Sequence, residues 1–205
     1  GQSTTTRHLA YDQPTYEMPL TLQHPEGVVT EIQRDVLGKP LAITRRSADG
    51  SQSLTRRYVY DAYQQPCKTI EPETGATVQD YDAAGNVLWS AAGTGLTSTA
   101  GCNRSEALAS GRAVKRSYDA ANRLSMLTFP DGRGSQSWSY TPDGLPAEIS
   151  TQNDAARPVV INRYQYNRRR LLTGETLQHP DLGTLNLAYG YDANGTLASN
   201  TYPGG

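Results

Sequence analysis

The chain has 205 residues and a formal net charge of -1, from 19 basic and 20 acidic residues. This balance argues against a protein that binds nucleic acid or an anionic membrane, because both would need a surplus of basic residues. The mean hydropathy of -0.62 and the lack of a run of about 18 apolar residues predict that no segment spans a membrane, and the opening GQSTTTRHLA has no apolar core of a targeting signal.

The composition favours strands joined by turns. The chain has 13 Tyr, 19 Gly and 12 Pro. Tyr is common in strands, whereas Gly and Pro are common in turns. Little helical periodicity is present, so we expect few helices. The initial Gly and the ending TYPGG suggest a piece of a longer polypeptide, whose targeting signal would then lie outside this sequence.

One short pattern recurs along the chain, most clearly as YDAAGNVL, YDAANRLS and YDANGTLA. Its Asp, or an Asn or Thr in the same place, can accept a hydrogen bond from the backbone two residues later. Gly, which tolerates positive φ, stands three residues after the Asp in most copies. We therefore predict a strand end, a tight turn and a strand start in each copy. The turns begin at Asp35, Asp61, Asp82, Asp119, Thr141, Asn167 and Asp192, and the residues three places later are Gly38, Gln64, Gly85, Asn122, Gly144, Arg170 and Gly195.

A second turn signal, Pro closely followed by an acidic residue or Gly, alternates with the first. It occurs at His24–Gly27, Glu71–Gly75, Phe129–Gly132, His179–Gly183 and Tyr202–Gly204. Turns about every dozen residues are typical of antiparallel hairpins. We therefore predict an all-β fold, an antiparallel β-meander that its native twist would coil into a curved strip. The expected strands are Val28–Arg34, Leu41–Arg46, Gln52–Tyr60, Cys67–Glu71, Ala76–Tyr81, Leu88–Ala92, Val114–Tyr118, Ser125–Phe129, Ser135–Tyr140, Ala147–Thr151, Val159–Tyr166, Thr173–Gln178, Thr184–Tyr191 and Ala198–Tyr202.

The repeats divide the chain unevenly. We expect residues 1–27 to be a partial leading repeat and residues 28–205 to be tandem repeats. The longest interval between turns holds an insertion at about 93–111 that is rich in Gly, Ser and Thr. Its second part, Cys102–Gly111, is the one place where we expect a short helix, with Ser105 as N-cap. The insertion is either a tolerated surface loop or an element that contacts another part of a longer protein.

Few residues are candidates for catalysis or metal binding. The repeated Asp residues could be calcium ligands or acid–base groups, but they occur once per unit, which favours turn formers. The three His residues lie apart, and no zinc-site spacing, nucleophile elbow or phosphate loop occurs. We therefore expect no catalytic residue, metal or cofactor. The expected structural turn residues include Tyr60, Asp61, Tyr81, Asp82, Gly85, Tyr118, Asp119, Tyr191, Asp192 and Gly195.

Three further features leave alternatives open. Cys67 begins an expected strand and Cys102 lies in the insertion, so a disulfide would tie the insertion to the ribbon; the alternative is two separate thiols. The basic run Arg168–Arg170 is either solvated or a contact for an acidic partner or lipid headgroups. Trp89 and Trp138 either pack across neighbouring strands or contact a glycan or partner.

The units YDAAGNVLWS, YDAANRLSMLTFPDG, YTPDGLPAEIS and YDANGTLAS resemble the YD repeats of the RHS (rearrangement hotspot) family, and the resemblance covers the chain from about Val28 onward. This family includes bacterial polymorphic toxins, shell proteins of insecticidal toxin complexes and animal teneurins. The resemblance implies a β-sheet strip that spirals into a hollow shell, which in bacterial members encloses a toxic C-terminal domain. The regular Asp turns fit the bacterial branch better than the teneurin branch. Bacterial shells end in a self-cleaving Asp-Pro-x-Gly motif; its absence here implies that this chain lacks the cleavage site, the plug and the toxin.

The resemblance thus implies a structural shell segment that helps to enclose and deliver a toxin domain, without catalytic activity of its own. Its partners would be other repeats and the C-terminal toxin domain of a secreted or cell-surface protein. The alternative is a carbohydrate- or partner-binding adhesion module. Because a strand ribbon has unpaired outer edges, we also expect edge-to-edge self-association.

Overall fold

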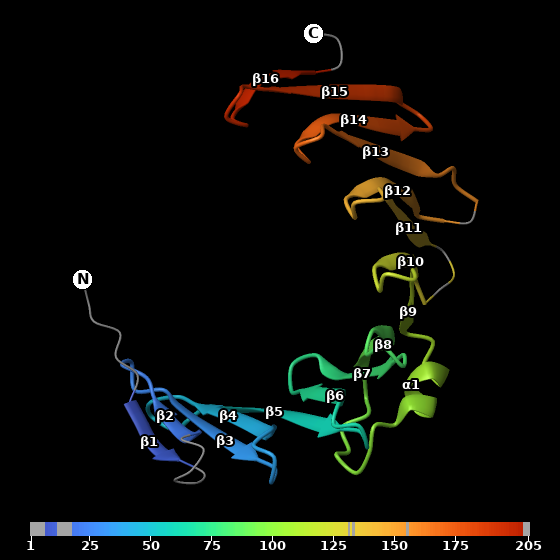
Figure 1. Cartoon of the computed structure of the whole chain (residues 1–205). Helices are drawn as coiled ribbons and strands as arrows, with labels where there is room; N and C mark the ends of the chain where they lie inside the picture. The colour runs from blue at the N-terminus through green and yellow to red at the C-terminus, as the bar shows by residue number, and fades with distance from the viewer. Residues whose placement is uncertain (1–6, 12–17, 131, 133, 155, 203–205) are drawn as a thin grey trace. The chain divides into compact units, whose positions relative to one another are not determined.

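The structure is a computed structural model that describes residues 7–11, 18–130, 132, 134–154 and 156–202. Its strands follow one another in a single 16-stranded sheet, ordered β1 to β16 as in the sequence (Figure 1). The pairs from β1·β2 to β6·β7 and from β9·β10 to β15·β16 are antiparallel. The predicted antiparallel β-meander is therefore confirmed. The strands are β1 (Arg7–Tyr11), β2 (Pro19–Gln23), β3 (Val29–Arg34), β4 (Pro40–Arg46), β5 (Ser53–Tyr60), β6 (Pro66–Glu71), β7 (Gly75–Tyr81), β8 (Val87–Thr94), β9 (Ala113–Tyr118), β10 (Leu124–Thr128), β11 (Ser135–Tyr140), β12 (Pro146–Gln152), β13 (Val160–Tyr166), β14 (Leu172–His179), β15 (Gly183–Tyr191) and β16 (Leu197–Thr201).

The turns share one hydrogen-bond pattern, which explains why these strands begin and end where they do. In all seven turns, the backbone N–H three residues after the first turn residue donates to that residue's carbonyl at 2.9 to 3.1 Å. The donating residue has a positive φ in every case, from 58° at Asn122 to 91° at Gly144. Three of these residues, Gln64, Asn122 and Arg170, are not glycine, so the turn geometry is retained where the usual residue is replaced.

The one helix among the described residues differs from its prediction. Helix α1 (Arg104–Ala109) is preceded by Asn103 as N-cap, at φ 55°, so Ser105 lies inside the helix. The prediction of Ser105 as N-cap is therefore wrong. Tertiary contacts override the local signal, because the Asn103 side chain is held by Lys68 from β6. No helix in the described part of the chain is long and apolar enough to cross a membrane.

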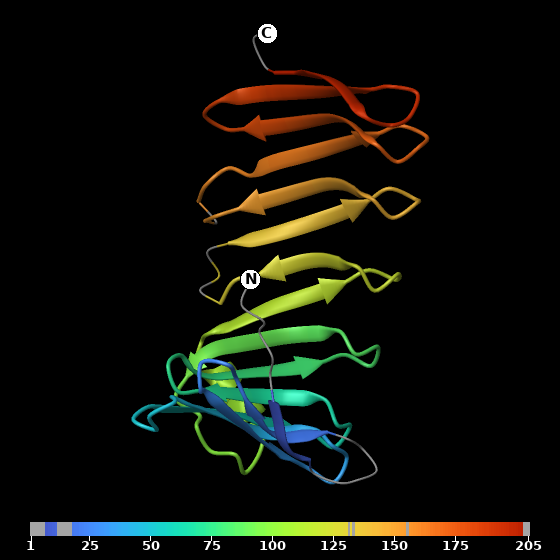
Figure 2. The ribbon, with the colours of Figure 1, turned by 90° about the vertical axis from the view of Figure 1, so that its left-hand side faces the viewer.

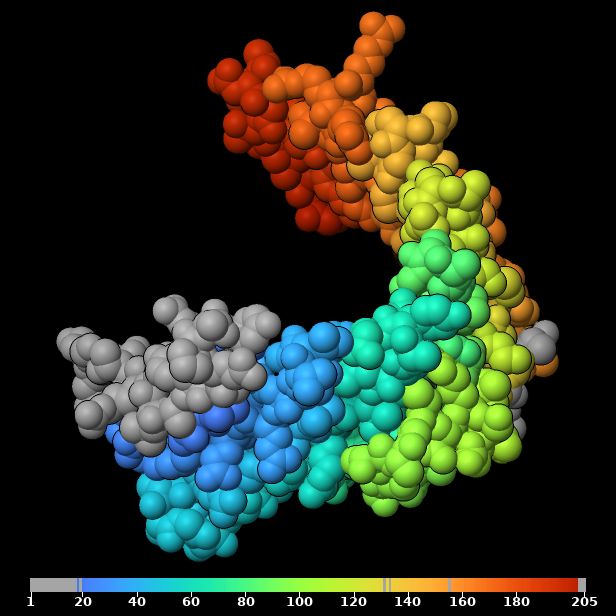
Figure 3. All heavy atoms as spheres, turned by 60° about the horizontal axis from the view of Figure 1, so that its bottom comes forward, coloured from blue at the N-terminus to red at the C-terminus, as the bar shows by residue number. Residues whose placement is uncertain are grey.

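The chain forms two compact units, which the sequence did not predict. Unit 1 comprises residues 1–80 and 90–113, and unit 2 comprises residues 81–89 and 114–205. Unit 1 holds nearly all of the fully buried apolar side chains, including Ile70, Val78 and Ala107. In the space-filling view, the green-to-lime atoms of the insertion pack against the rest of this unit (Figure 3). The insertion therefore gives unit 1 a core that a bare strand ribbon would lack.

Unit 2 is a plain ribbon. Its strands β9 to β16 lie side by side and are joined by short turns (Figure 2). Most side chains of these strands are half-buried, and the strand β16 is exposed along its whole length. Stability in this unit therefore rests on the hydrogen-bond ladders and on side-chain pairs between neighbouring strands.

Candidate functional site

The repeated carboxylates are engaged within their own turns. The Oδ1 atom of Asp82 accepts hydrogen bonds from the backbone N–H groups of Ala84 at 2.9 Å and Asn86 at 2.8 Å. The side chain of Asn86 also donates to Asp82, and this bond is the main reason why the pKa of Asp82 lies below its ordinary value. The described residues contain no group of three or more His, Cys, Asp or Glu side chains that could hold a metal ion. The geometry therefore supports turn formation as the task of these Asp residues.

The tyrosines before four of the seven turns have a second task, which the sequence did not reveal. Each hydroxyl donates to the carbonyl of the first residue of the strand that follows the preceding turn. The observed pairs are Tyr60 with Pro40 at 3.0 Å, Tyr118 with Val87 at 2.9 Å, Tyr140 with Leu124 at 2.8 Å, and Tyr191 with Leu172 at 2.8 Å. These bonds tie four of the repeats to the repeat before them. Every residue has a carbonyl, so the acceptor position carries no signal in the sequence.

Neighbouring turns also contact each other directly through side chains. Lys39 donates to the Gln64 carbonyl at 2.5 Å. In unit 2, Arg169 donates to the Ala193 carbonyl at 2.8 Å, and Arg170 forms an ion pair with Asp143 at 3.6 Å. Two residues of the basic run Arg168–Arg170 thus bind adjacent turns of the same ribbon.

The two tryptophans differ in exposure. Trp89 is only 8% exposed, so its ring offers little surface for stacking on a sugar. Trp138, on β11, is half-buried. A hollow of about 480 Å³ lies in unit 1, and its lining includes Arg57, Tyr58 and Thr99. The hollow combines aromatic and polar side chains, so a ligand there would meet both kinds of group.

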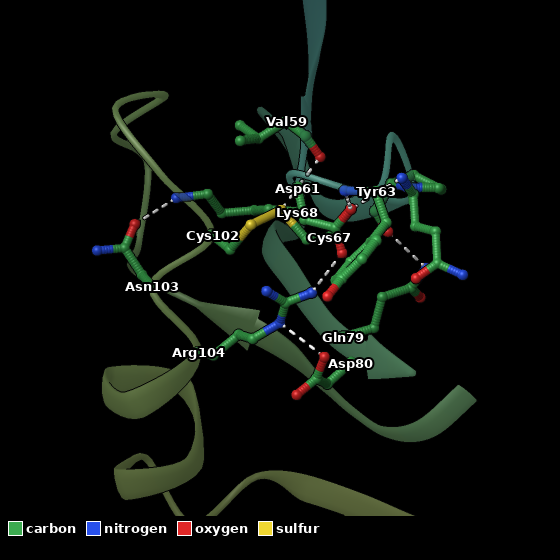
Figure 4. Close-up of a disulfide and its surroundings, with 12 residues drawn as sticks. Val59, Asp61, Tyr63, Cys67, Lys68, Gln79, Asp80, Cys102, Asn103 and Arg104 are labelled. Atoms are coloured by element: carbon green, nitrogen blue, oxygen red, sulfur yellow. Dashed lines mark hydrogen bonds and ion pairs between the residues drawn. A yellow bond between two sulfur atoms is a disulfide. The ribbon is translucent and has the colours of Figure 1, made fainter. Parts of the chain in front are cut away.

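The insertion is fixed to the strands of unit 1 by three consecutive residues (Figure 4). The first is Cys102, which forms a disulfide with Cys67 of β6, with a Cα–Cα distance of 5.5 Å across a sequence separation of 35 residues. The Cys67 side chain is completely buried. Of the two alternatives that the sequence left open, the structure has the disulfide.

The second anchor residue is Asn103, which meets a buried lysine. Lys68 follows Cys67 on β6 and is 1% exposed. Its Nζ donates to the Ser98 carbonyl at 2.6 Å and to Asn103 Oδ1 at 2.5 Å. Burial lowers the pKa of Lys68, and the negative charge of Glu106 acts in the opposite direction. A single Lys in a strand gives no sequence signal of burial, so this residue was missed.

The third anchor residue is Arg104, which joins two carboxylates from different strand ends. Its Nη2 lies 2.8 Å from Asp61 Oδ2, and its Nε lies 2.8 Å from Asp80 Oδ1. The Asp61 side chain is only 7% exposed. Burial raises the pKa of Asp61, but hydrogen bonds from the Gln65 backbone and from Arg104 outweigh it, so the pKa is lowered overall. Asp61 therefore serves both its own turn and the insertion.

Comparisons with known proteins identify the fold. No family model matches the sequence, and a search of curated proteins finds no match. Among solved structures, the chain is similar to a crystal structure of TcdB2-TccC3 without the hypervariable C-terminal region, with a TM-score of 0.61, 17% identity and coverage of 96% of this chain. It is also similar to TcdB2-TccC3-Cdc42 (TM-score 0.61, 17% identity, 97% of this chain) and to the Tc holotoxin pore of Photorhabdus luminescens (TM-score 0.56, 18% identity, 91% of this chain).

The chain spans only 11% of the length of each of these structures. At such low identity the likeness concerns the fold, and it extends over nearly the whole chain. The antiparallel β-sheet strip expected from the resemblance to RHS repeats is therefore confirmed.

Proposed function

We propose that this chain is a structural segment of an RHS-repeat shell that encloses a toxin domain and helps to deliver it, and that it has no catalytic activity of its own. The observation that carries the proposal is the match of its fold, over 96% of the chain, to a chain of a toxin complex. Its partners are then the neighbouring repeats and a C-terminal toxin domain of a secreted or cell-surface protein.

The bonding within the ribbon supports a wall rather than a reaction site. Each turn residue is used inside its own turn, and each tyrosine hydroxyl described above binds the adjacent repeat. A ribbon built in this way can be extended by further repeats, because each repeat needs only its neighbours.

A proline in the middle of a strand tests this proposal in the full-length protein that carries a C-terminal domain. Thr176→Pro in β14 would remove a ladder bond between two central strands. We expect the variant to expose the C-terminal domain to added protease, whereas the unmodified protein protects it. The matched control is Ala193→Pro, since proline is favoured at the second residue of such a turn and Pro142 occupies that place in a sister turn. Equal protection in both variants would contradict the proposal.

A second candidate function is binding of a carbohydrate or another partner. The hollow lined by Arg57 and Tyr58 favours this function. The burial of Trp89 argues against that residue as a glycan contact. A glycan array tests this function: a defined sugar whose binding is lost in Tyr58→Ala or Trp138→Ala, with the fold intact, would support it. Absence of binding to any glycan would remove the carbohydrate form of this candidate.

Edge-to-edge self-association stays a proposal. The strand β16 is the last in the strand order of the described residues and is exposed, so in this chain taken alone its outer edge offers backbone groups for pairing. Light scattering after size exclusion would detect such pairing, and a strict monomer at high concentration would contradict it.

A further inference from the structure

An amine, a carboxamide and a carboxylate converge where the insertion meets β6 in unit 1. Lys68 Nζ lies 2.5 Å from Asn103 Oδ1. The Nδ2 atom of the same carboxamide donates to Glu106 Oε1 at 3.1 Å. Turn formation and the ribbon ladder use none of these three side chains. They bring together a nucleophile, an acyl carbon and a group that can accept and return a proton.

We propose that Lys68 and Asn103 form an intramolecular amide bond. The Nζ lone pair attacks Cγ of Asn103, the bond between Cγ and Nδ2 breaks, and Nδ2 leaves as ammonia. One proton passes from Nζ to the leaving nitrogen. The reaction conserves oxidation state, so it needs no oxidant, reductant or cofactor. Its products are a Lys–Asn crosslink and one ammonia molecule.

The environment of Lys68 favours this attack. The side chain is 1% exposed, and a desolvated lysine amine is a stronger nucleophile than a solvated one because its neutral form is more populated. In agreement, burial lowers the pKa of Lys68, with Glu106 as the charged group that opposes the shift. The second hydrogen bond, to the Ser98 carbonyl, holds the amine in place.

The disulfide holds the two reactants together. Cys67 immediately precedes Lys68, and Cys102 immediately precedes Asn103, so the Cys67–Cys102 bond fixes both backbones next to the reacting atoms. Holding two groups in contact converts a slow bimolecular step into a fast intramolecular one. Asn103 is also held at φ 55°, so its carboxamide is presented by a constrained backbone.

Glu106 is placed to move the proton. Its Oε1 contacts Nδ2, the nitrogen that must gain a proton before it can leave. Proton transfer by a positioned side chain accelerates such steps by about 100-fold or more. The crosslink would anchor the insertion independently of the disulfide, since thiol reductants cleave disulfides and leave amides intact.

Trypsin mapping of the reduced, denatured chain tests the proposal. Trypsin cleaves an unmodified chain after Lys68 and releases residues 58–68 and 69–104 as separate peptides, because neither contains another internal Lys or Arg. The crosslink blocks cleavage after Lys68, since the acylated lysine has lost its charge. We therefore expect one peptide, residues 58–104, that is lighter than its calculated mass by one ammonia. Succinimide formation at another Asn would also release ammonia but would leave cleavage after Lys68 unaffected.

Two variants sharpen the test. Lys68→Arg keeps the charge and the hydrogen-bond donors but removes the nucleophile, so ammonia loss at this site should vanish while the Cys67–Cys102 disulfide still forms. Glu106→Gln keeps an acceptor for Asn103 but cannot carry a proton, so crosslinking should slow by about 100-fold.

Two results would overturn parts of this inference. If the folded, disulfide-bonded chain yields only the two separate peptides, even after incubation at alkaline pH, the amide bond is refuted. If Glu106→Gln crosslinks as fast as the unmodified chain, the assignment of proton transfer to Glu106 is refuted.

Discussion

At the residue scale, the fourth position of the turns shows how a side chain changes the backbone angle φ. The glycines there have φ between 81° and 91°, at Gly38, Gly85, Gly144 and Gly195, whereas the other three residues have φ between 58° and 64°. The centre of the left-handed region lies near the second range. A residue with a side chain at this position therefore adopts φ near the centre of the left-handed region, which is the left-handed conformation that a side chain tolerates.

Replacing Gly144 tests this reading. A Cβ at this position would lie 3.6 Å from Arg123 Nη1, an ordinary contact, so any cost comes from the backbone. We expect Gly144→Ala to lower the free energy of unfolding by about 1–2 kcal/mol. Gly144→Asn should cost clearly less, because Asn tolerates positive φ and Asn122 occupies the same place in a sister turn. Urea denaturation measures both, and equal losses would contradict the backbone explanation.

The tyrosine hydroxyls are a second residue-scale feature. Tyr60→Phe removes the hydrogen bond to the Pro40 carbonyl and keeps the ring over which the Lys39 ammonium lies. We expect a loss of about 1 kcal/mol in the free energy of unfolding. Tyr63→Phe is the matched control, because Tyr63 is 86% exposed and its replacement should change little. Similar losses in both variants would show that the hydroxyl bond contributes nothing specific.

The same tyrosine predicts a response to alkaline pH. Burial, followed by the charge of Asp35, raises the pKa of Tyr60 above its ordinary value. The folded state therefore prefers the protonated phenol. Its contribution is complete below the ordinary value of about 10 and is lost as pH rises through the higher, folded value. Tyr60→Phe should accordingly weaken the loss of stability above about pH 10, as followed by denaturation at a series of pH values.

At the element scale, local chemistry made the strands predictable and long-range contacts made the insertion unpredictable. The strand β11 begins and ends at its predicted residues, because turn residues on both sides set its limits. The anchors Lys68 and Arg104 bind partners 35 and 43 residues away in the sequence. Neither the spacing of these residues in the sequence nor their type predicts such contacts. The cysteine pair was the only anchor with a sequence signal, since a chain with two cysteines can form a disulfide between them.

The ion pairs of Arg104 yield an element-scale prediction. Arg104→Lys keeps the charge, but an ammonium cannot reach Asp61 and Asp80 with the two arms of a planar fork. We expect faster amide hydrogen exchange in α1 and a loss of about 1 kcal/mol in the free energy of unfolding. Arg112→Lys, at an exposed position just after the insertion, is the control and should leave exchange in α1 unchanged.

Acid should act on the same anchor. The pKa of Asp61 is lowered overall in the folded chain, so its contribution is present above the ordinary value of about 3.9 and is lost as pH falls through the folded value. Exchange in α1 should accelerate over that range in the unmodified chain. An identical acid response in Arg104→Lys would mean that the ion pair plays no part.

At the scale of the whole molecule, repeats and insertion have different consequences. The repeats predict one uniform ribbon, and the ladder indeed runs from β1 to β16. The chain nevertheless divides into two compact units, with the insertion entirely in unit 1. Repeat proteins are stabilised by local terms that act mostly between neighbours. A local anchor should therefore change the stability of its own unit and leave the other unchanged.

Removal of the disulfide tests this independence. In the Lys68→Arg background, where no amide crosslink can form, reduction of Cys67–Cys102 should destabilise unit 1 by about 3–4 kcal/mol in the chain-entropy model for a separation of 35 residues. Hydrogen exchange should then accelerate in β5, β6 and α1 and stay unchanged in β13 to β15, because both cysteines lie in unit 1, whereas β13 to β15 lie in unit 2. Uniform acceleration along the whole ribbon would instead mean that the strand ladder transmits the loss and that the two units unfold as one.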